Sequence, residues 1–251
     1  MCELFGFSAA KKTDISDYLK EFFAHSDKNP HGWGMMFGEN REIVKGAEKA
    51  ADSEKLRTML GSFAPQSTTV AHIRFATVGS IKQVNCHPFE GTDISGRQWT
   101  MAHNGTVYSA KNTYRYLDAQ QGDTDSERLF MAFLEMMNDK LAKGDLSERQ
   151  RFKAVNDFIT ENAPRNKLNL IFYDGDLMYA HKNLKNTLSF KQTRDGVFIS
   201  THPLDNGEWK PFPMAQVIAF RAGKEVYRGK PHKGIFVPTL EYITAMDAMN
   251  I

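Results

Sequence analysis

The apolar positions near the N-terminus change from a strand-like to a helical spacing. Residues 2–8 form a mostly apolar run, which predicts a buried strand. Behind the polar Thr13-Asp14 pair, apolar residues recur at helical spacing, and they are Ile15, Tyr18, Leu19, Phe22 and Phe23. We therefore expect the chain to begin with a strand that leads into a helix.

The next stretch predicts an antiparallel hairpin, a short helix and another strand. Met35–Phe37 and Glu42–Val44 flank Gly38-Glu39-Asn40, a turn-forming sequence. A short helix is expected over Ser53–Leu60, and Thr68–Phe75 reads as a strand. The far end of that strand carries Arg74.

The middle of the chain predicts one strand and two helices. The strand over Gln98–Ala102 is expected to stop at Asn104-Gly105, because Asn-Gly favours a turn with positive φ. Asp125 is expected to cap a helix that ends near Leu141, and a second helix is expected over Ser147–Asn162. The segment Val78–Gly96 has no predicted element, and its length indicates a functional loop.

The last third of the chain is rich in predicted strands. They are expected over Leu168–Tyr173, Leu177–His181, Leu188–Gln192, Val197–Ser200, Val217–Arg221 and Glu225–Tyr227. Strands, then helices, then strands again predict an α+β protein with two antiparallel sheets covered by helices. We expect residues 1–251 to form one domain.

Composition narrows the functional classes. The 32 basic and 30 acidic residues leave a net charge of +2 without a basic block, so we expect neither nucleic acid nor a membrane as partner. No apolar run reaches the ~18 residues of a spanning helix, and no secretory signal is evident. Two cysteines are too few for a disulfide framework. We therefore expect a cytoplasmic protein.

Cys2 is a candidate nucleophile. Met1 can be removed because Cys is a small residue, and its removal leaves a thiol and a free amine on one residue. The reference pKa of an α-amine is ~7.7–8.0 and that of a thiol ~8.5, so the amine can act as the base for the thiol. The alternative is that Cys2 is a small apolar residue of a buried strand.

Polar residues near the ends of predicted elements suit an amino acid with a side-chain amide as substrate. The planar guanidinium of Arg74 can bind an α-carboxylate, and Asp125 can pair with an α-ammonium group. The Asn104 carboxamide and the Gly105 N–H can donate to the oxyanion that forms when Cys2 attacks a carbonyl. Two alternatives stay open, a buried ion pair for Arg74 and a cap alone for Asp125.

Five motifs carry a resemblance to a known family. They are Met-Cys-Glu-Leu-Phe-Gly from Met1, His31–Gly34, His72–Gly79, His103–Gly105 and Thr124–Glu127. Their order resembles that of class II glutamine amidotransferases, which are N-terminal-nucleophile hydrolases. The motifs cover residues 2 to about 130, and the strand-rich remainder resembles the short standalone members of the family.

The resemblance implies a four-layer αββα sandwich and a role for each site residue, with no metal and no cofactor. By this resemblance, Cys2 is the nucleophile, and Arg74 and Asp125 bind the glutamyl carboxylate and ammonium groups. Asn104 and Gly105 form the oxyanion hole, and Thr77 positions the substrate. Amino-sugar synthases of the family have Trp and His where this chain has Phe75 and Val78. Because Val78 stands where those synthases have His, the coupling role of that His is not expected in this chain.

Other residues have competing interpretations. Trp33, Gly34 and His87 are candidate pocket residues, and Trp33 is equally a candidate core anchor. Cys86 and His87 are adjacent, so on an extended chain their side chains point in opposite directions and do not form a catalytic pair. A metal site is also conceivable from His72, His87, His103 and Cys86, but the spacing matches no known zinc pattern.

The sequence thus predicts an amidohydrolase acting on glutamine or a γ-glutamyl amide through a γ-glutamyl thioester, with release of glutamate. Since 251 residues leave no room for a synthase domain, we expect a free-standing enzyme or one subunit of a complex. The alternatives are a glutaminase subunit that supplies ammonia to a separate synthase, and a non-catalytic glutamine-binding regulatory subunit that keeps Met1. The leaving group and a homo-oligomeric state stay open.

Overall fold

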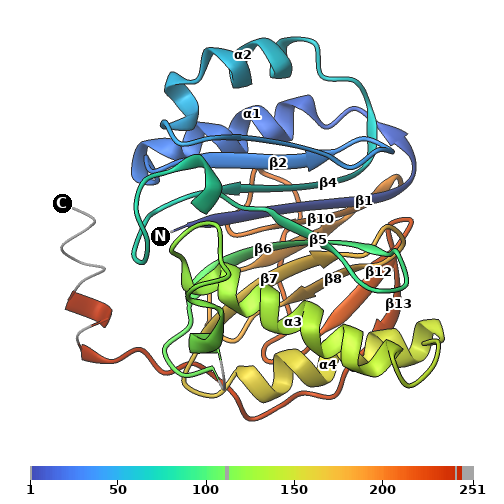
Figure 1. Cartoon of the computed structure of the whole chain (residues 1–251). Helices are drawn as coiled ribbons and strands as arrows, with labels where there is room; N and C mark the ends of the chain where they lie inside the picture. The colour runs from blue at the N-terminus through green and yellow to red at the C-terminus, as the bar shows by residue number, and fades with distance from the viewer. Residues whose placement is uncertain (1, 111–112, 241, 245–251) are drawn as a thin grey trace.

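Two β-sheets face each other and carry helices on their outer sides (Figure 1). The computed structural model describes residues 2–110, 113–240 and 242–244. The helices α1 and α2 cover one sheet, and α3 and α4 cover the other, so the four layers are helix, sheet, sheet, helix (Figure 1). This arrangement confirms the predicted α+β class with two antiparallel sheets between helices.

Among the described residues, the first sheet has seven strands in the order β11-β9-β10-β1-β4-β2-β3. Its strands are β1 (Glu3–Thr13), β2 (Trp33–Phe37), β3 (Glu42–Gly46), β4 (Gln66–Ile73), β9 (Ser189–Gln192), β10 (Gly196–Ser200) and β11 (Lys210–Pro211). The N-terminal strand β1 lies near the middle, between β4 and β10, and pairs antiparallel with both. Residues just before β1 and just after β4 are therefore neighbours.

The second sheet has six strands within the described ranges, in the order β13-β12-β8-β7-β6-β5. Its strands are β5 (Phe89–Thr92), β6 (Gln98–Thr106), β7 (Lys167–Tyr173), β8 (Met178–His181), β12 (Ile218–Arg221) and β13 (Lys224–Arg228). The helices are α1 (Ser16–Ala24), α2 (Glu54–Gly61), α3 (Asp125–Leu141) and α4 (Glu148–Asn162). In the part of the chain that the structure describes, no helix is long and apolar enough to cross a membrane.

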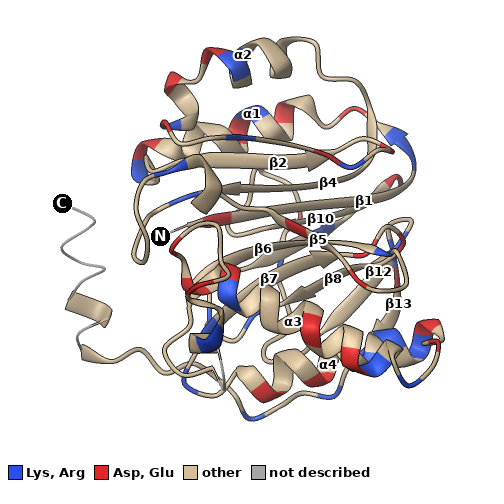
Figure 2. Ribbon diagram, viewed as in Figure 1, with Lys and Arg blue, Asp and Glu red and all other residues tan. Residues whose placement is uncertain are grey.

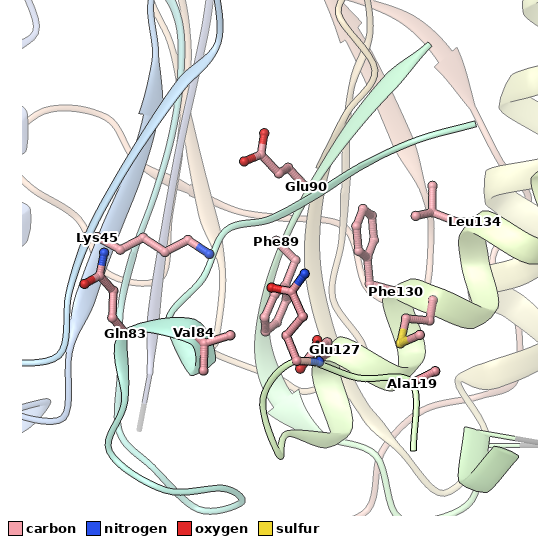
Figure 3. Close-up of a pocket in the computed structure, with 11 residues that line it drawn as sticks. Lys45, Gln83, Val84, Phe89, Glu90, Ala119, Glu127, Phe130 and Leu134 are labelled. Carbon is pink, nitrogen blue, oxygen red and sulfur yellow. Dashed lines mark hydrogen bonds between the residues drawn. The ribbon is translucent and has the colours of Figure 1, made fainter. Parts of the chain in front are cut away.

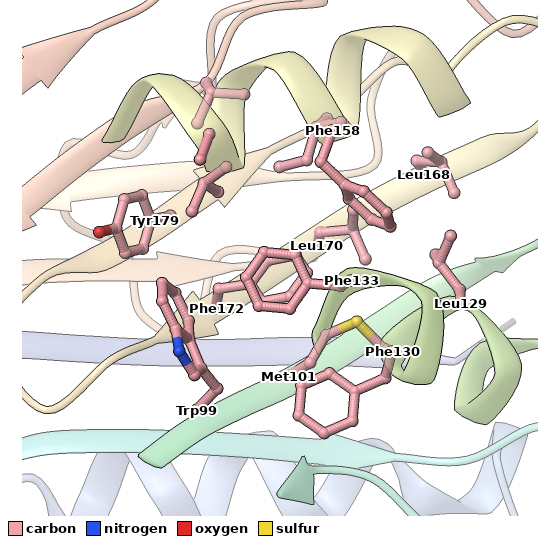
Figure 4. Packing of buried hydrophobic residues seen from close by; sticks show 14 of the residues in the cluster. Trp99, Met101, Leu129, Phe130, Phe133, Phe158, Leu168, Leu170, Phe172 and Tyr179 are labelled. Atoms are coloured by element: carbon pink, nitrogen blue, oxygen red, sulfur yellow. The ribbon is translucent and has the colours of Figure 1, made fainter. Parts of the chain in front are cut away.

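Apolar side chains fill all three spaces between the layers. Beneath α3 and α4, the aromatic rings of Trp99 and Phe133 pack edge to face with centroids 4.8 Å apart (Figure 4). Strand β1 is buried on both faces, because Phe5 packs on Phe22 of α1 while Leu4 belongs to the layer between the sheets. Burial on both faces explains why residues 2–8 are apolar without alternation.

Asn104-Gly105 does not form a turn, so that prediction was wrong. Both residues lie inside β6, opposite Asn169 and Leu168 of β7. A Cβ atom on Gly105 would lie 1.8 Å from the Lys167 carbonyl oxygen. The glycine therefore allows β6 and β7 to approach each other closely. The Asn-Gly dipeptide alone does not show whether its glycine serves such a close approach or a turn.

The predicted cap of α3 and the structure of residues 78–96 also need correction. Thr124 is the N-cap, because its Oγ1 accepts a hydrogen bond from the Glu127 N–H at 3.1 Å, and Asp125 is the first helical residue. The segment 78–96 contains a short 3₁₀ helix, Gln83–Asn85, and strand β5. No strand was predicted there because β5 has only four residues and alternates poorly.

Candidate active site

Cys2 lies directly before β1, against the backbone that follows β4. The thiol donates to the Phe75 carbonyl oxygen at 3.2 Å, and Sγ accepts a hydrogen bond from the Phe75 N–H at 3.1 Å. The pairing of β1 with β4, in which Glu3 is opposite Ile73, brings these two segments together. Met1 lies outside the described residues, so the structure does not test whether it is removed.

Burial raises the pKa of the Cys2 thiol above its ordinary value. The Phe75 N–H and the nearby cations Lys167 and Arg74 act in the opposite direction, because they stabilise a thiolate. The desolvation effect is the largest of these. At neutral pH the sulfur is therefore held mainly as a thiol, and it needs a base in order to attack a carbonyl carbon.

The guanidinium of Arg74 organises the loop that follows β4. Its Nη1 donates to the Ser80 carbonyl oxygen at 3.0 Å, and its Nη2 donates to the carbonyl oxygens of Val78 at 3.0 Å and Gly79 at 3.3 Å. Arg74 is buried, so its charge is compensated by main-chain oxygens of the loop. The loop is thus built around the Arg74 guanidinium. Thr77 lies in this loop and is exposed.

Two further contacts fix this loop. His31 Nδ1 accepts a hydrogen bond from the Ala76 N–H at 3.0 Å, which holds the backbone next to the Phe75 contact with Cys2. Asn85 is completely buried and donates through Nδ2 to the Ser80 carbonyl oxygen at 2.8 Å. Its Oδ1 accepts from the Asp123 N–H at 3.0 Å, so the loop is tied to the segment before α3.

Asn104 of β6 presents its amide nitrogen without a partner. The Asn104 Oδ1 accepts a hydrogen bond from Lys167 Nζ at 3.0 Å, whereas Nδ2 has no hydrogen-bond partner in the described part of the chain. Asn104 is only 1% exposed. A buried amide N–H without a partner is costly, and such a group is available to a substrate oxygen.

Asp125 lies at the N-terminus of α3, beside the end of β6. Its Oδ2 accepts a hydrogen bond from the Val107 N–H at 2.6 Å, which anchors the chain just after β6. The neighbouring Ser126 hydroxyl bonds to Nδ1 of His103 at 2.9 Å, and His103 Nε2 donates to the Lys167 carbonyl oxygen at 2.9 Å. Burial lowers the pKa of His103, so this histidine is a neutral connector between α3 and β7.

The three candidate pocket residues lie in tightly packed surroundings. Trp33 is fully buried, and its indole N–H donates to Glu48 Oε1 at 3.1 Å. A Cβ atom on Gly34 would lie 2.1 Å from the His87 carbonyl oxygen, so glycine allows these backbones to touch. The His87 ring packs edge to face on His72 with centroids 4.3 Å apart. Contact of these residues with a substrate stays a prediction.

No group of three or more His, Cys, Asp or Glu side chains in the described ranges is arranged to hold a metal ion. Cys86 is buried, and its thiol donates to the Gly46 carbonyl oxygen at 3.2 Å. Burial raises the pKa of Cys86 to about 11, so its thiol is unreactive at neutral pH. Of the two cysteines, Cys2 is the better placed for chemistry.

A separate cavity of about 570 Å³ opens between β3, β5 and α3 (Figure 3). Lys45 enters it from β3, Glu90 from β5, and Phe130 and Leu134 from α3 (Figure 3). The Lys45 ammonium lies 5.3 Å from the centre of the Phe89 ring. Its lining residues include neither Cys2 nor Asn104, so this cavity is distinct from the candidate active site.

Two residues near the site were missed by sequence reasoning. Lys167 begins β7 and is buried beside Asn104, and Tyr242 interacts electrostatically with Cys2 while its ring packs 5.4 Å from that of Phe236. A lysine at the edge of an apolar strand normally indicates solvent exposure, so no sequence signal distinguished Lys167. Its burial depends on pairing between β6 and β7.

Residues 1–195 match the family described as "Glutamine amidotransferases class-II". The chain belongs to this family. The match extends over all the described site residues from Cys2 to Lys167. It also agrees with the order of the five sequence motifs.

Relatives and solved structures extend the comparison to most of the chain. The uncharacterized protein MJ1515 of Methanocaldococcus jannaschii is 26% identical over 261 residues, which cover 92% of this chain and 72% of that protein. The structure of a "predicted glutamine amidotransferase from Pseudomonas aeruginosa PA01" matches 90% of this chain and 100% of that chain, with TM-score 0.64 and 22% identity.

The fold is also that of one half of a larger enzyme. The match with glutamine phosphoribosylpyrophosphate amidotransferase from B. subtilis covers 93% of this chain and 50% of the chain of that enzyme, with TM-score 0.67 and 13% identity. At this identity the likeness concerns the fold alone. The four-layer αββα sandwich implied by the sequence motifs is therefore confirmed.

Proposed function

We propose that this protein is an amidohydrolase that cleaves the γ-amide of glutamine or of a γ-glutamyl compound, with Cys2 as nucleophile. The observation that carries the proposal is that Lys167 lies near Cys2, whose sulfur is bonded to the Phe75 backbone, and also bonds Asn104, whose Nδ2 has no partner among the described residues. Membership of the class II glutamine amidotransferases supports the glutamyl substrate.

The first step forms a thioester. The Cys2 α-amine, free once Met1 is removed, takes the thiol proton, and Sγ attacks the γ-carbonyl carbon. The carbonyl oxygen becomes an oxyanion that accepts hydrogen bonds from Asn104 Nδ2 and the Gly105 N–H. The C–N bond then breaks, the amine base returns its proton to the leaving nitrogen, and ammonia or an amine departs.

The second step restores the enzyme. Water adds to the γ-glutamyl thioester with loss of a proton to the α-amine, and the C–S bond breaks to release glutamate and the Cys2 thiol. Asp125 is proposed to pair with the substrate ammonium group, and Arg74 with the substrate carboxylate. Arg74 also holds the carbonyl oxygens of residues 78–80, so loop and substrate would share one cation.

Release of glutamate tests this function directly. Purified protein is incubated with glutamine and with γ-glutamyl peptides, and glutamate is measured for the wild type, Cys2→Ala and Cys86→Ala. We expect glutamate release by the wild type and Cys86→Ala, and none above background for Cys2→Ala. Equal rates for Cys2→Ala and the wild type would overturn the mechanism.

A second candidate is a glutaminase subunit that supplies ammonia to a separate synthase. The observation in its favour is that the chain matches half of the B. subtilis amidotransferase. This function predicts weak glutaminase activity alone and a rise in kcat when a partner isolated by co-purification is added. Full activity without any partner would favour the independent hydrolase.

A further inference from the structure

Lys167 is a buried cation between the two sheets. It is the first residue of β7 and lies opposite Thr106 of β6, and only 2% of it is exposed. Burial lowers the pKa of Lys167 to about 8, while the nearby Cys2 thiol acts to raise it. Since an ammonium group loses much hydration when buried, its contacts must compensate for that cost.

The contact with Asn104 determines which way the carboxamide points. An ammonium group can only donate hydrogen bonds, so the Asn104 atom 3.0 Å from Lys167 Nζ must be the carbonyl oxygen Oδ1. The NH₂ group then faces the other way, where Nδ2 has no partner among the described residues. A cation on the oxygen also polarises the amide and strengthens the N–H donors.

The backbone of Lys167 contributes to the same geometry. Its carbonyl oxygen accepts a hydrogen bond from His103 Nε2 at 2.9 Å. The same oxygen lies close to the Cα of Gly105, since a Cβ atom added to that glycine would be only 1.8 Å away. The Lys167 carbonyl oxygen therefore bonds the residue before Asn104 and lies against the residue after it. Side chain and main chain together leave Asn104 little freedom.

We propose that Lys167 is a positioning residue that orients the Asn104 carboxamide so that its NH₂ group donates to the reacting carbonyl oxygen. The inference rests on the proposed function, because it assigns Lys167 to the oxyanion hole of that reaction. Among the described residues, the groups near Lys167 on other elements include Cys2 before β1, and Asn104 and His103 of β6. The assigned role is orientation, and no proton transfer by Lys167 is involved.

Substitution of Lys167 by Met removes the donor and keeps most of the apolar stem. We expect Lys167→Met to lower kcat roughly 10- to 100-fold, less than the ~10²–10³ typical for complete loss of an oxyanion donor, with little change in KM. Lys182 is a matched control, because it is also buried and its Nζ donates to the Leu188 carbonyl oxygen at 2.8 Å. Lys182→Met should keep kcat within about twofold of the wild type at a temperature where it is folded.

A double-mutant cycle separates positioning from a general loss of structure. If Lys167 acts through Asn104, Lys167→Met should have little effect on kcat in a chain that already carries Asn104→Ala. We therefore expect the factor by which Lys167→Met lowers kcat to be much smaller in the Asn104→Ala background than in the wild type, with a small remainder from the loss of a cation near Cys2. Equal factors in both backgrounds, or a wild-type kcat for Lys167→Met, would overturn the inference.

A spectroscopic measurement keeps the inference separate from the proposed function. The side-chain ¹⁵N–¹H₂ signals of Asn104, assigned by their loss in Asn104→Ala, should shift in Lys167→Met and stay in place in Lys182→Met. If the wild type releases no glutamate but these signals shift as expected, the proposed function fails and the positioning role stands. Unchanged Asn104 signals in Lys167→Met would overturn the positioning role, whatever the activity.

Discussion

The sulfur of Cys2 and the amide nitrogen of Asn104 are positioned by opposite sheets. The main chain of Phe75, just beyond the end of β4, supplies both hydrogen bonds to the sulfur, while Lys167 of the second sheet bonds the oxygen of the Asn104 amide. The position of each of these two atoms therefore depends on a different strand pairing. The relative position of the two atoms depends on how the sheets pack.

The pH dependence of Cys2 alkylation reports this environment. Because burial raises the thiol pKa, the rate of reaction with iodoacetamide should rise with pH and reach its midpoint above the ordinary thiol value. In Lys167→Met the midpoint should move further up, because a cation that lowers the pKa of Cys2 is lost. The measurement is the rate of adduct formation at Cys2 by mass spectrometry. A downward shift would contradict the proposed influence of Lys167 on the thiol.

The residue types of the site were predictable from the sequence, but the arrangement of their contacts was not. Cys2, Arg74, Asn104 and Asp125 stand in recognisable motifs, and the structure places Cys2 and Arg74 around one backbone segment. Lys167 has no motif, because its role depends on a cross-strand contact with a residue 63 positions away. The roles of all these residues in the reaction stay predictions.

At the scale of elements, the loop after β4 is the part of the site with its own internal structure. Arg74 gathers its carbonyl oxygens, and Asn85 links it to Asp123 ahead of α3. The loop after β4 and the N-terminus of α3 therefore form one unit. This unit carries Arg74 and Asp125, the proposed ligands of the substrate's carboxylate and ammonium groups. Substitution of Asn85 should therefore weaken substrate binding more than it slows the chemical step.

We expect Asn85→Ala to raise KM several-fold and to leave kcat less affected. The buried link is lost, so the free energy of unfolding should fall by about 1–3 kcal/mol. Asn162→Ala is a suitable control, because that side chain donates to the Phe158 carbonyl oxygen within α4, at 2.8 Å. Steady-state kinetics and denaturant unfolding test this, and an unchanged KM would show that the link does not shape the substrate site.

Element types were predicted better than element ends. Most strands and the helices α1 to α4 lie where apolar periodicity placed them. The error at Asn104-Gly105 arises because the local sequence suits a turn while pairing of β6 with β7 decides the outcome. At the start of α3, Thr124 and Asp125 are both residue types that suit a cap, and Asp125 instead accepts a hydrogen bond from the Val107 N–H. The four-residue strand β5 is stabilised by pairing with β6, which local patterns do not reveal.

At the scale of the whole molecule, charges of both signs are interspersed over α3 and α4 (Figure 2). The sequence likewise combines 32 basic and 30 acidic residues without a basic block. Asp174, in the turn between β7 and β8, forms a buried ion pair with Arg151 of α4 at 2.6 Å. It ties the second sheet to its covering helix.

Loss of this ion pair should lower stability without altering the reaction. Asp174→Ala leaves Arg151 buried without its closest carboxylate, so we expect a loss of about 3–5 kcal/mol in the free energy of unfolding, with kcat and KM unchanged at temperatures where the variant is folded. Asp157→Ala breaks the exposed pair with Lys153 and should cost about 0–1 kcal/mol. Denaturant unfolding measures both losses, and similar values in the two variants would show that the buried pair has no special role.

Covalent trapping with a diazoketone analogue of glutamine tests the central claim most directly. Its electrophilic carbon alkylates a nucleophile in a glutamine site with loss of N₂, and peptide mapping by mass spectrometry identifies the modified residue. We predict a single adduct on Cys2, only on chains that have lost Met1, formed in step with the loss of glutaminase activity and prevented by excess glutamine. An adduct on Cys86, or equal activity of chains that retain Met1, would contradict the proposed mechanism.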